Sequence, residues 1–351
     1  MQTIDLRSDF LAHPSDAMYA AAQAARDSRC FGLREDPWQR GLEARAAEML
    51  AMEDALVFPT CSMANTTALL LAAEPGSRVL TQPDAHVLVS EAGAGAALGG
   101  LVLTPVGGVE PEPELAAMPP LAAWSTALAA GHDAQRPAVR LCVLENTHNR
   151  SGGIPLPPEY VDAVTASARA HGVRLHLDGA RLFNAAQALG LPLARLTRGF
   201  DTVSLSLNKS LGAPIAAVLA GSRVLIERAL VIRQRLGGGI RPTGPASAAT
   251  LAALDDLGHF AQVQDLAGRL AAGLDRCAAL DVLPVALRTN IVIARVRAPE
   301  SASRMITRLA AKGLLAIALD EQRIRFVVYR GIDAAQIERA IAIAGALGPA
   351  S

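Results

Sequence analysis

Two side chains, Asp178 and Lys209, stand where parallel-sheet proteins bind ligands. Asp178 directly follows a short branched run at residues 173–177, and a second apolar run at residues 201–207 leads to Lys209. Both runs have the length and composition of buried strands. Ligands bind beyond the carboxyl ends of such strands. We therefore expect a carboxylate and an amine at neighbouring strand ends.

A carboxylate beside a lysine suits pyridoxal phosphate (PLP) chemistry. The amine can form an imine with the cofactor's aldehyde, while the carboxylate keeps the pyridine nitrogen protonated so that the ring accepts electrons. The chain has only two lysines, and Lys312 precedes Gly313 at an expected helix end, where a cation is favourable. Lys209 is thus the candidate. Taken alone, Asp178 is equally well explained as the N-cap of the next helix.

Seven motifs extend this pattern along the chain. They read IDLRSD at residues 4–9, PTCSMAN at 59–65, DAHVLVSEAG at 84–93, LENTHN at 144–149, HLDGARLFNA at 176–185, SLNKSLGAP at 206–214 and LGGGIR at 236–241. In these motifs the chain resembles the low-specificity L-threonine aldolases, fold-type I PLP enzymes of the branch that also holds the aromatic β-eliminating lyases. The resemblance runs from residue 4 to about residue 330 and so covers nearly the whole chain.

The resemblance implies an α/β fold of the aspartate aminotransferase-like, fold-type I class. A large PLP-binding domain with a mainly parallel sheet is expected at residues 1–245, with the N-terminal segment included. A small C-terminal α+β domain is expected at residues 246–351, beginning with a long linking helix at 246–277. A chain of 351 residues is long enough for two such domains. Strands of the small domain are expected at residues 290–297, 314–319 and 324–328.

An anion site is expected where the strand at residues 55–58 meets a polar turn. Helix N-termini favour phosphate through their free N–H groups and their dipole, so Cys61 and Ser62 are the expected donors, ahead of a helix at 66–73. Seen alone, this turn is more readily explained as an ordinary helix cap. The most apolar stretch, residues 87–106, contains Glu91 and four glycines, and we expect a helix and then a buried strand there.

The resemblance also implies roles for two histidines. The family's histidine that stacks on the cofactor ring corresponds to His86, for which a structural cap or core position is the alternative. His148 follows the expected strand at residues 139–144 and is therefore well placed for proton transfer.

Three residues are implied to bind the substrate carboxylate: Ser8, Arg181 and Arg325. Arg181 lies about one helical turn beyond Asp178, and Arg325 lies among apolar strand residues, where an unpaired charge is costly. The alternatives are a turn serine, a surface arginine at a helix start and an edge-strand arginine facing water. After three glycines comes Arg241, which in the family approaches the phosphate of a neighbouring subunit. We therefore expect at least a dimer, and further a homotetramer.

The implied reaction is retro-aldol cleavage of β-hydroxy-α-amino acids, with L-threonine or L-allo-threonine giving glycine and acetaldehyde. The base at the β-hydroxyl is His86 or His148, acting directly or through water. Four residues near the expected site depart from the family pattern: Phe31, Cys61, Arg150 and Gln234. Two alternatives therefore stay open. One is another PLP reaction on the same scaffold, such as β-elimination, and the other is a non-catalytic PLP-binding protein.

The composition of the chain limits the classes of binding partner that we expect. Lysine plus arginine and aspartate plus glutamate each total 33, so the net charge is zero and no like-charge block invites nucleic acid or a membrane surface. The start of the chain has no signal-peptide pattern. The four cysteines form no C-x-x-C pair. We expect a cytoplasmic protein with reduced thiols and a small-molecule amino-acid substrate, and we expect no metal site.

Overall fold

The computed structural model describes residues 3–108, 113–130, 135–215 and 217–348. Parts of the proline-rich stretch at 110–137, and one position of the strand expected at 215–220, lie outside the described residues. Among the described helices, none is both long and apolar enough to cross a membrane.

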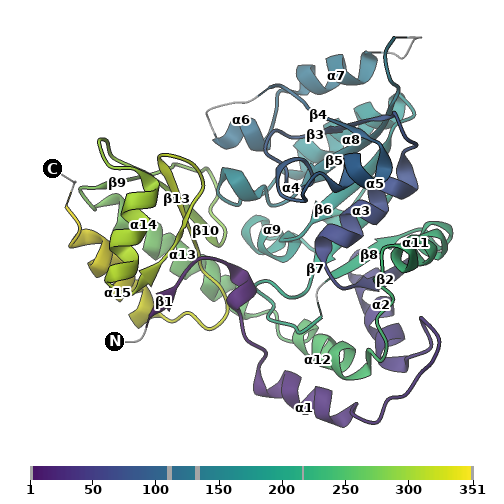
Figure 1. The fold of residues 1–351 in the computed structure, drawn as a ribbon, viewed down its shortest axis with the longest axis horizontal. Coiled ribbons are helices and arrows are strands. Elements are labelled where there is room, and N and C mark those ends of the chain that lie inside the picture. Colours follow the sequence, from purple (N-terminus) through teal and green to yellow (C-terminus); the bar gives the residue numbers. More distant parts are fainter. Residues whose placement is uncertain (1–2, 109–112, 131–134, 216, 349–351) are drawn as a thin grey trace.

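A seven-stranded sheet forms the centre of the larger part of the molecule, the large unit (Figure 1). Its order is β2-β8-β7-β6-β5-β3-β4, and only β8 runs antiparallel to its neighbours. The strands are β2 (Asp54–Phe58), β3 (Arg78–Thr81), β4 (Val102–Pro105), β5 (Val139–Glu145), β6 (Arg174–Gly179), β7 (Thr202–Ser206) and β8 (Ala217–Gly221). The expected mainly parallel sheet is confirmed. The buried strand expected at the end of residues 87–106 was wrong in its burial, because the strand there, β4, lies at the edge of the sheet and is half-exposed.

Helices cover both faces of this sheet, because alternate strand residues point to opposite faces. Leu56 of β2 and Val143 of β5 pack toward α3, α5 and α11, while Val57 and Leu144 pack toward α2, α8 and α9. The helices of this unit are α1 (Asp16–Ala24), α2 (Pro37–Met49), α3 (Cys61–Ala72), α4 (His86–Val89), α5 (Ala94–Gly99), α6 (Pro113–Ala117), α7 (Leu121–Ala129), α8 (Pro158–Ala170), α9 (Leu182–Leu189), α10 (Leu193–Leu196), α11 (Arg223–Arg235) and α12 (Gly244–Leu254), with 3-10 turns η1 (Asp9–Leu11) and η2 (Asn149–Ser151).

Helix α3 begins five residues earlier than expected, at Cys61 rather than at residue 66. Thr60 is its N-cap, and the Thr60 hydroxyl accepts a hydrogen bond of 3.1 Å from the Met63 amide. The polar turn that the sequence suggested as an anion site is therefore the first turn of the helix itself.

The prediction of a single linking helix at residues 246–277 was wrong, because two helices occupy this stretch. Helix α12 ends at Leu254 and α13 (His259–Asp275) begins after Gly258. Two aspartates and a glycine separate them, and these residue types favour a helix poorly. Helix α12 packs against α1 and α2, whereas α13 packs against α15. The break therefore lets the chain pass from the large unit to the C-terminal unit.

The C-terminal unit is an antiparallel sheet of order β12-β13-β10-β9, packed against α13, α14 (Ala302–Ala311) and α15 (Ala334–Gly345). Its strands are β9 (Leu280–Val282), which the sequence did not suggest, β10 (Ile291–Val296), β12 (Ile317–Ala318) and β13 (Arg323–Val327). The strand expected at 314–319 is split: β11 (Leu314–Leu315) leaves this sheet and pairs with β1 (Ile4–Asp5).

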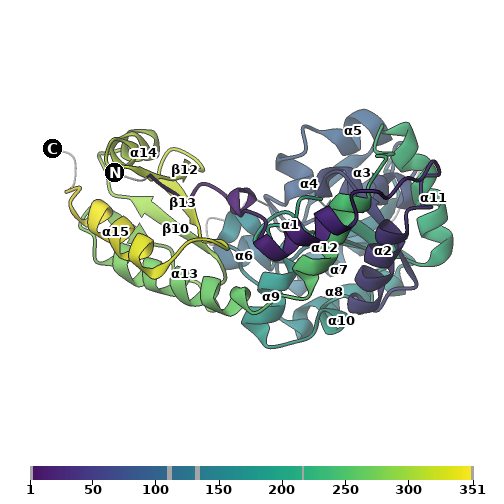
Figure 2. The same cartoon turned by 90° about the horizontal axis from the view of Figure 1, so that it is seen from below.

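The N-terminal arm, residues 3–15, joins the two units. Ile4 and Leu6 lie in the core of the C-terminal unit, and the chain then crosses through η1 to α1 on the large unit (Figures 1 and 2). The first residues thus pack with the C-terminal unit, although the sequence grouped them with the large domain. A division into domains near residue 245 stays a prediction. Ser8 and Asp9 lie on this crossing.

Candidate active site

Asp178 is held by neutral donors at the carboxyl end of β6. Its side chain is buried, and its two oxygens accept hydrogen bonds from Asn65 Nδ2 at 2.8 Å and from the Ala180 amide at 3.1 Å. The second bond is a local turn contact, but the N-cap alternative was wrong, because α9 begins at Leu182 with Arg181 as its N-cap. Asn65, in contrast, is 113 residues away in the sequence. No cation in the described chain pairs with this carboxylate. It is available to a positively charged ligand group.

A buried network behind Asn65 sets the orientation of its amide. Asn65 Oδ1 accepts from Ser204 Oγ at 2.6 Å and lies 3.1 Å from His176 Nε2. An amide oxygen only accepts, so His176 carries its proton on Nε2, and its Nδ1 accepts from the Thr202 hydroxyl at 2.9 Å. Burial lowers the pKa of His176 to about 4, which keeps the ring neutral. The network therefore orients the Asn65 amide so that its two N–H bonds point to Glu91 and Asp178.

Lys209 follows β7, the strand next to the one that carries Asp178, and a shared role of the two side chains at a cofactor stays a prediction. Strand β7 pairs with β6 so that Ser204 stands opposite Asp178, and the chain continues to the buried Lys209. Cys61 Sγ lies 3.6 Å from Ser204 Oγ. Burial and the charge of Asp178 raise the pKa of the Cys61 thiol to about 12, against an opposite effect from Lys209. Cys61, Asp178 and Lys209 therefore share one electrostatic environment.

The first turn of α3 completes a set of groups that fits PLP. The amides of Cys61 and Ser62 lie in that turn, where helical N–H groups have no carbonyl partner within the helix. PLP offers an aldehyde, a basic ring nitrogen and a phosphate. Lys209, Asp178 and the start of α3 are chemically complementary to these three groups in turn.

His86 is the first residue of α4, and carboxylates hold it at two points. Its Nδ1 lies 2.8 Å from Glu91 Oε1, and its backbone amide donates to Glu145 Oε2 at 2.5 Å. Burial lowers the pKa of His86, but the hydrogen bond to Glu91 and the charges of Asp178 and Glu145 outweigh burial and raise it overall. Its side chain keeps 32% of its surface exposed. His86 thus has an accessible ring with a raised pKa.

His148 has a different environment. The side chain is fully buried, and its Nδ1 lies 2.8 Å from Ser151 Oγ. Its Nε2 is buried and has no hydrogen-bond partner among the described residues. The Ser151 hydroxyl can donate or accept, so it leaves both tautomers of His148 open.

Two arginines converge on one amide oxygen. Arg181 Nη1 and Arg325 Nη1 both donate to Asn149 Oδ1, at 3.2 Å and 3.0 Å. Burial and the nearby charge of Arg181 lower the pKa of Arg325 to about 10. Arg325 Nε is buried and has no hydrogen-bond partner in the part of the chain that the structure describes. Two guanidinium groups around one neutral oxygen form a site that favours a carboxylate.

Asp9 fixes the plane of Arg181. The Asp9 carboxylate binds Arg181 Nε at 2.7 Å and Nη2 at 2.8 Å, and it also accepts longer bonds from Ser210 and Asn290. Burial would raise the pKa of Asp9, but Arg181 dominates and lowers it to about 2. One edge of the Arg181 fork is therefore occupied by the protein itself.

Ser8 precedes this ion pair. Its hydroxyl accepts a 3.3 Å hydrogen bond from the Phe10 amide, as the turn-serine alternative predicted. The residues on both sides of it contact the two arginines: Arg7 O accepts from Arg325, and Asp9 binds Arg181. A role for Ser8 toward substrate stays a prediction.

Arg241 makes its contacts elsewhere within the single chain. Its guanidinium donates to the Phe31 carbonyl at 3.0 Å and lies 5.7 Å from the centre of the Phe31 ring, which is 87% exposed. No hydrogen bond of Arg241 to Cys61 or Ser62 appears among the described residues, and its role at a phosphate stays a prediction.

Sequence reasoning missed several residues that hold the predicted ones. The signal that could have found them is their position inside the matched motifs, next to predicted residues. They are Asp9, Asn65, Glu91, Glu145 and Asn149.

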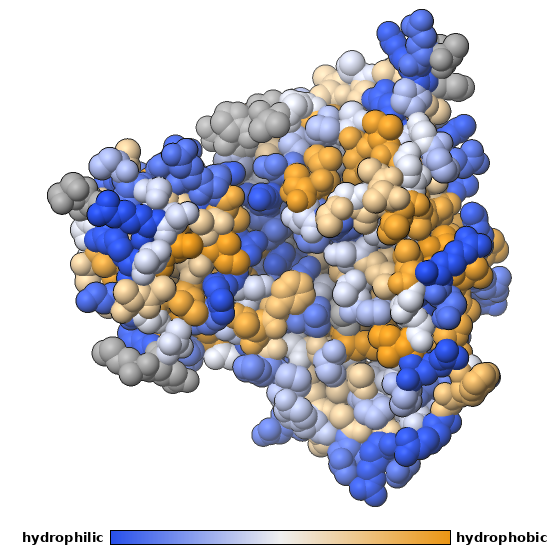
Figure 3. Space-filling model, in the orientation of Figure 1, coloured by the Kyte–Doolittle hydropathy of each residue, from blue (hydrophilic) through white to orange (hydrophobic). Residues whose placement is uncertain are grey.

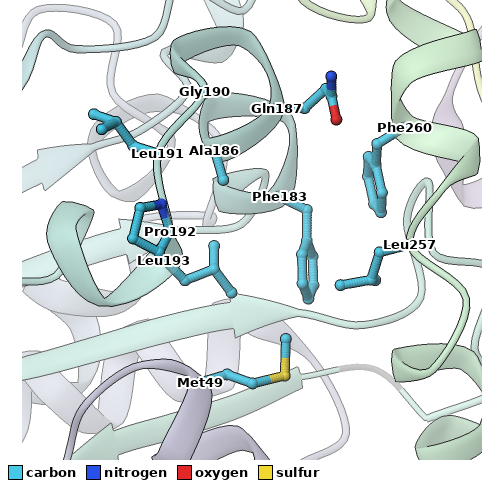
Figure 4. A pocket seen from close by; sticks show the side chains of 10 residues that line it. All are labelled: Met49, Phe183, Ala186, Gln187, Gly190, Leu191, Pro192, Leu193, Leu257 and Phe260. Atoms are coloured by element: carbon cyan, nitrogen blue, oxygen red, sulfur yellow. The ribbon is translucent and has the colours of Figure 1, made fainter.

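Hydrophilic residues line the hollow between the C-terminal unit and the large unit (Figure 3). An apolar pocket of about 540 Å³ lies behind α9, between Met49, Leu257 and Phe260 (Figure 4). No ionisable residue lines this pocket. This pocket therefore offers no group for acid–base chemistry.

The chain is similar to several known proteins. The family model described as "Beta-eliminating lyase" matches residues 5–297. "Low-specificity L-threonine aldolase 1" of Arabidopsis thaliana is 35% identical over 346 residues, which cover 96% of this chain and 94% of that protein. "Low specificity L-threonine aldolase" of Escherichia coli K12 is 35% identical, with coverage of 89% and 90%. The structure of Leishmania major threonine aldolase superposes with a TM-score of 0.80 at 19% identity, covering 97% of this chain and 98% of that one.

Proposed function

Because the chain belongs to the beta-eliminating lyase family, and within it to the low-specificity L-threonine aldolases, we propose that it cleaves L-threonine and L-allo-threonine to glycine and acetaldehyde with PLP. Related β-hydroxy-α-amino acids are further substrates. The observation that carries the proposal is the pairing of a buried carboxylate, Asp178, with the buried Lys209 at the ends of adjacent parallel strands. The expected fold-type I architecture is confirmed by the fold shared with solved threonine aldolases.

PLP, when bound, supplies the electron sink that accepts the bonding pair left on Cα when the Cα–Cβ bond breaks. Lys209 would hold its aldehyde carbon, and Asp178 would keep its ring nitrogen protonated. Cys61 and Ser62 would hold its phosphate through their backbone amides. His86 would lie against the ring, and Arg241 of a second copy would reach the phosphate.

Arg325 and Arg181 would bind the substrate carboxylate, together with Ser8. The two guanidinium groups already meet at Asn149 Oδ1, and Asp9 holds Arg181 in plane before substrate arrives. Such preorganisation lowers the entropic cost of binding. It would also fix the carboxyl end of the amino acid.

One proton must leave the β-hydroxyl as the Cα–Cβ bond breaks, and one must arrive at Cα to give glycine. His86 or His148, directly or through water, would take the first. Imidazole suits this role because its pKa lies near neutral pH.

A homo-oligomer follows from the position of Arg241, with a dimer as the minimum and a tetramer as the further proposal. Exposed apolar residues support it: Leu98 on α5 and Val224 and Val231 on α11 are each more than half exposed, and apolar residues gather on that side of the large unit (Figure 3). Such patches on a protein surface commonly mark interfaces. A cytoplasmic location is supported by four free cysteines among the described residues.

Product analysis tests the function. Purified, PLP-loaded protein is incubated separately with L-threonine and L-allo-threonine. Glycine and acetaldehyde are expected. 2-Oxobutyrate and ammonia would instead establish β-elimination, and absence of both pairs of products from the PLP-loaded protein would favour a non-catalytic role.

A further inference from the structure

Glu91 connects the accessible histidine to the cofactor carboxylate. Glu91 Oε1 lies 2.8 Å from His86 Nδ1 and accepts from Asn65 Nδ2 at 2.8 Å, while the same nitrogen donates to Asp178 Oδ2 at 2.8 Å. One imidazole nitrogen of His86 and one carboxylate oxygen each of Glu91 and Asp178 all lie within 4.8 Å of one another. The two N–H bonds of a single amide therefore hold two carboxylates at a fixed separation.

We propose that Glu91, held in place by Asn65, is a positioning residue that keeps the proton of His86 on Nδ1 and leaves Nε2 as the acceptor of the substrate's β-hydroxyl proton. This inference rests on the proposed function. A carboxylate on one imidazole nitrogen selects the tautomer and stabilises the cation that forms when the other nitrogen takes a proton.

The environments of the two histidines decide between them. His86 keeps 32% of its side chain exposed and has an anionic partner at Nδ1. His148 is fully buried, and its Nδ1 partner is the neutral hydroxyl of Ser151. A base must reach its substrate and must be stabilised once protonated. Only His86 meets both requirements.

The charges around His86 support the same assignment. Three carboxylates act on the ring: Glu91 from the turn between α4 and α5, Asp178 from the end of β6 and Glu145 from the end of β5. Burial raises the pKa of Glu91, and the charge of Asp178 raises it further. The hydrogen bond to His86 acts in the opposite direction, but the pKa stays raised overall. A proton gained by His86 Nε2 therefore relieves the repulsion between the Glu91 and Asp178 carboxylates.

The electron balance of the step is complete. His86 Nε2 bonds the hydroxyl proton, and the former O–H pair becomes the second bond of the aldehyde carbonyl. The Cα–Cβ pair moves onto Cα, where the cofactor supplies the sink, and Cα then takes a proton to give glycine. No oxidant or further reactant is needed.

A matched pair of variants tests the proposal, since each removes the Nδ1 partner of one histidine. Glu91→Gln removes the anion beside His86, and Ser151→Ala removes the hydroxyl beside His148. The pKa and tautomer of His86 are read by NMR of protein labelled with ¹⁵N-histidine, with the signal assigned through a His86→Asn variant. The pH profile of kcat for threonine cleavage is measured on the loaded enzymes.

We expect Nδ1-protonated neutral His86 in the unmodified protein. In Glu91→Gln the pKa of His86 falls by about one unit or more, the acidic limb of the kcat profile moves to lower pH, and kcat at pH 7 falls roughly tenfold or more. In Ser151→Ala none of these changes.

Three results would overturn the proposal. One is neutral His86 protonated on Nε2 in the unmodified protein, which needs no variant to be stable. Another is an unchanged His86 pKa in Glu91→Gln. The third is a shift of the acidic limb by Ser151→Ala alone, which would assign the base to His148. Absence of glycine from the unmodified, loaded enzyme would instead overturn the proposed function itself.

Discussion

At the scale of single residues, the site consists of predicted groups and of the partners that orient them. Lys209, Asp178 and the two arginines were expected, and their residue types suggest their chemistry. Each is held by a residue of less obvious role: Asn65 holds Asp178, and Asp9 holds Arg181. Predictions at this scale concern which of these groups reacts and which positions.

Lys209→Ala is expected to remove the visible absorbance of enzyme-bound cofactor and to reduce kcat by at least a thousandfold, because no other amine lies in the site. Lys312→Ala is the matched control, since Lys312 is the C-cap of α14 and the chain has no third lysine. Absorbance spectra and glycine formation measure both. Unchanged absorbance in Lys209→Ala would exclude Lys209 as the cofactor lysine.

Asp9→Asn is expected to raise KM for threonine roughly tenfold, the equivalent of about 1.4 kcal/mol, with kcat largely kept. Arg181 would lose its fork partner and with it a fixed plane. Asp5→Asn is the control, because Asp5 pairs with the exposed Arg7 on the same arm. A lower kcat at unchanged KM would contradict a positioning role for Asp9 in substrate binding.

The stability of the same variant is expected to depend on pH. The folded-state pKa of Asp9 is about 2, below the ordinary value of 3.8. The carboxylate therefore stabilises the fold above about pH 4, by about 2 kcal/mol, and this contribution is lost as the pH falls toward 2. Denaturant unfolding should show a gap between the original protein and Asp9→Asn at pH 7 that narrows in acid. A gap independent of pH would contradict the assignment.

At the scale of elements, the periodic patterns predicted most strands and helices, and the failures have local causes. Helix α3 began earlier than expected because Thr60 caps it, and the long helix at 246–277 divides because its halves pack against different units. Packing partners far along the sequence decide such boundaries, whereas propensity sets only the approximate extent of an element.

Thr60→Val is expected to lower the free energy of unfolding by about 1 kcal/mol, the effect of removing a helix cap, and also to weaken PLP affinity. The second effect arises because the cap positions the first turn of α3. Ser222→Ala removes the comparable cap of α11, where the Ser222 hydroxyl accepts from Leu225 N at 3.4 Å. This control should lose stability without losing PLP affinity, as measured by PLP titration. Equal PLP affinity in both variants would place the phosphate elsewhere.

At the scale of the whole molecule, two features matter: the N-terminal arm, which connects the two units, and the exposed surface around Phe31. The arm begins with β1 in the C-terminal unit and crosses to α1 on the large unit, so it ties the substrate arginines of both units together. Phe31 carries the Arg241 contact on an exposed surface. The proposed phosphate contact of Arg241 would therefore belong to an assembly of chains.

Arg241→Ala is expected to weaken PLP affinity roughly tenfold, the equivalent of about 1.4 kcal/mol, while light scattering still shows an oligomer. Arg235→Ala is the control, because Arg235 is an exposed arginine at the end of α11, the helix that precedes the loop of Arg241. PLP titration of both variants measures the difference. Full affinity in Arg241→Ala, or a monomer for the unmodified protein, would contradict a phosphate contact from a second copy.

The sequence by itself determined which groups are predicted to react, because their signals are local: a strand pattern before Asp178, a second before Lys209, and motifs a few residues long. Only the tertiary structure decided what orients them. Asp9 and Arg181 are 172 residues apart, and Asn65 and Asp178 are 113 residues apart. No periodicity or propensity encodes such pairs, because they exist only once the strands are paired and the N-terminal arm is packed.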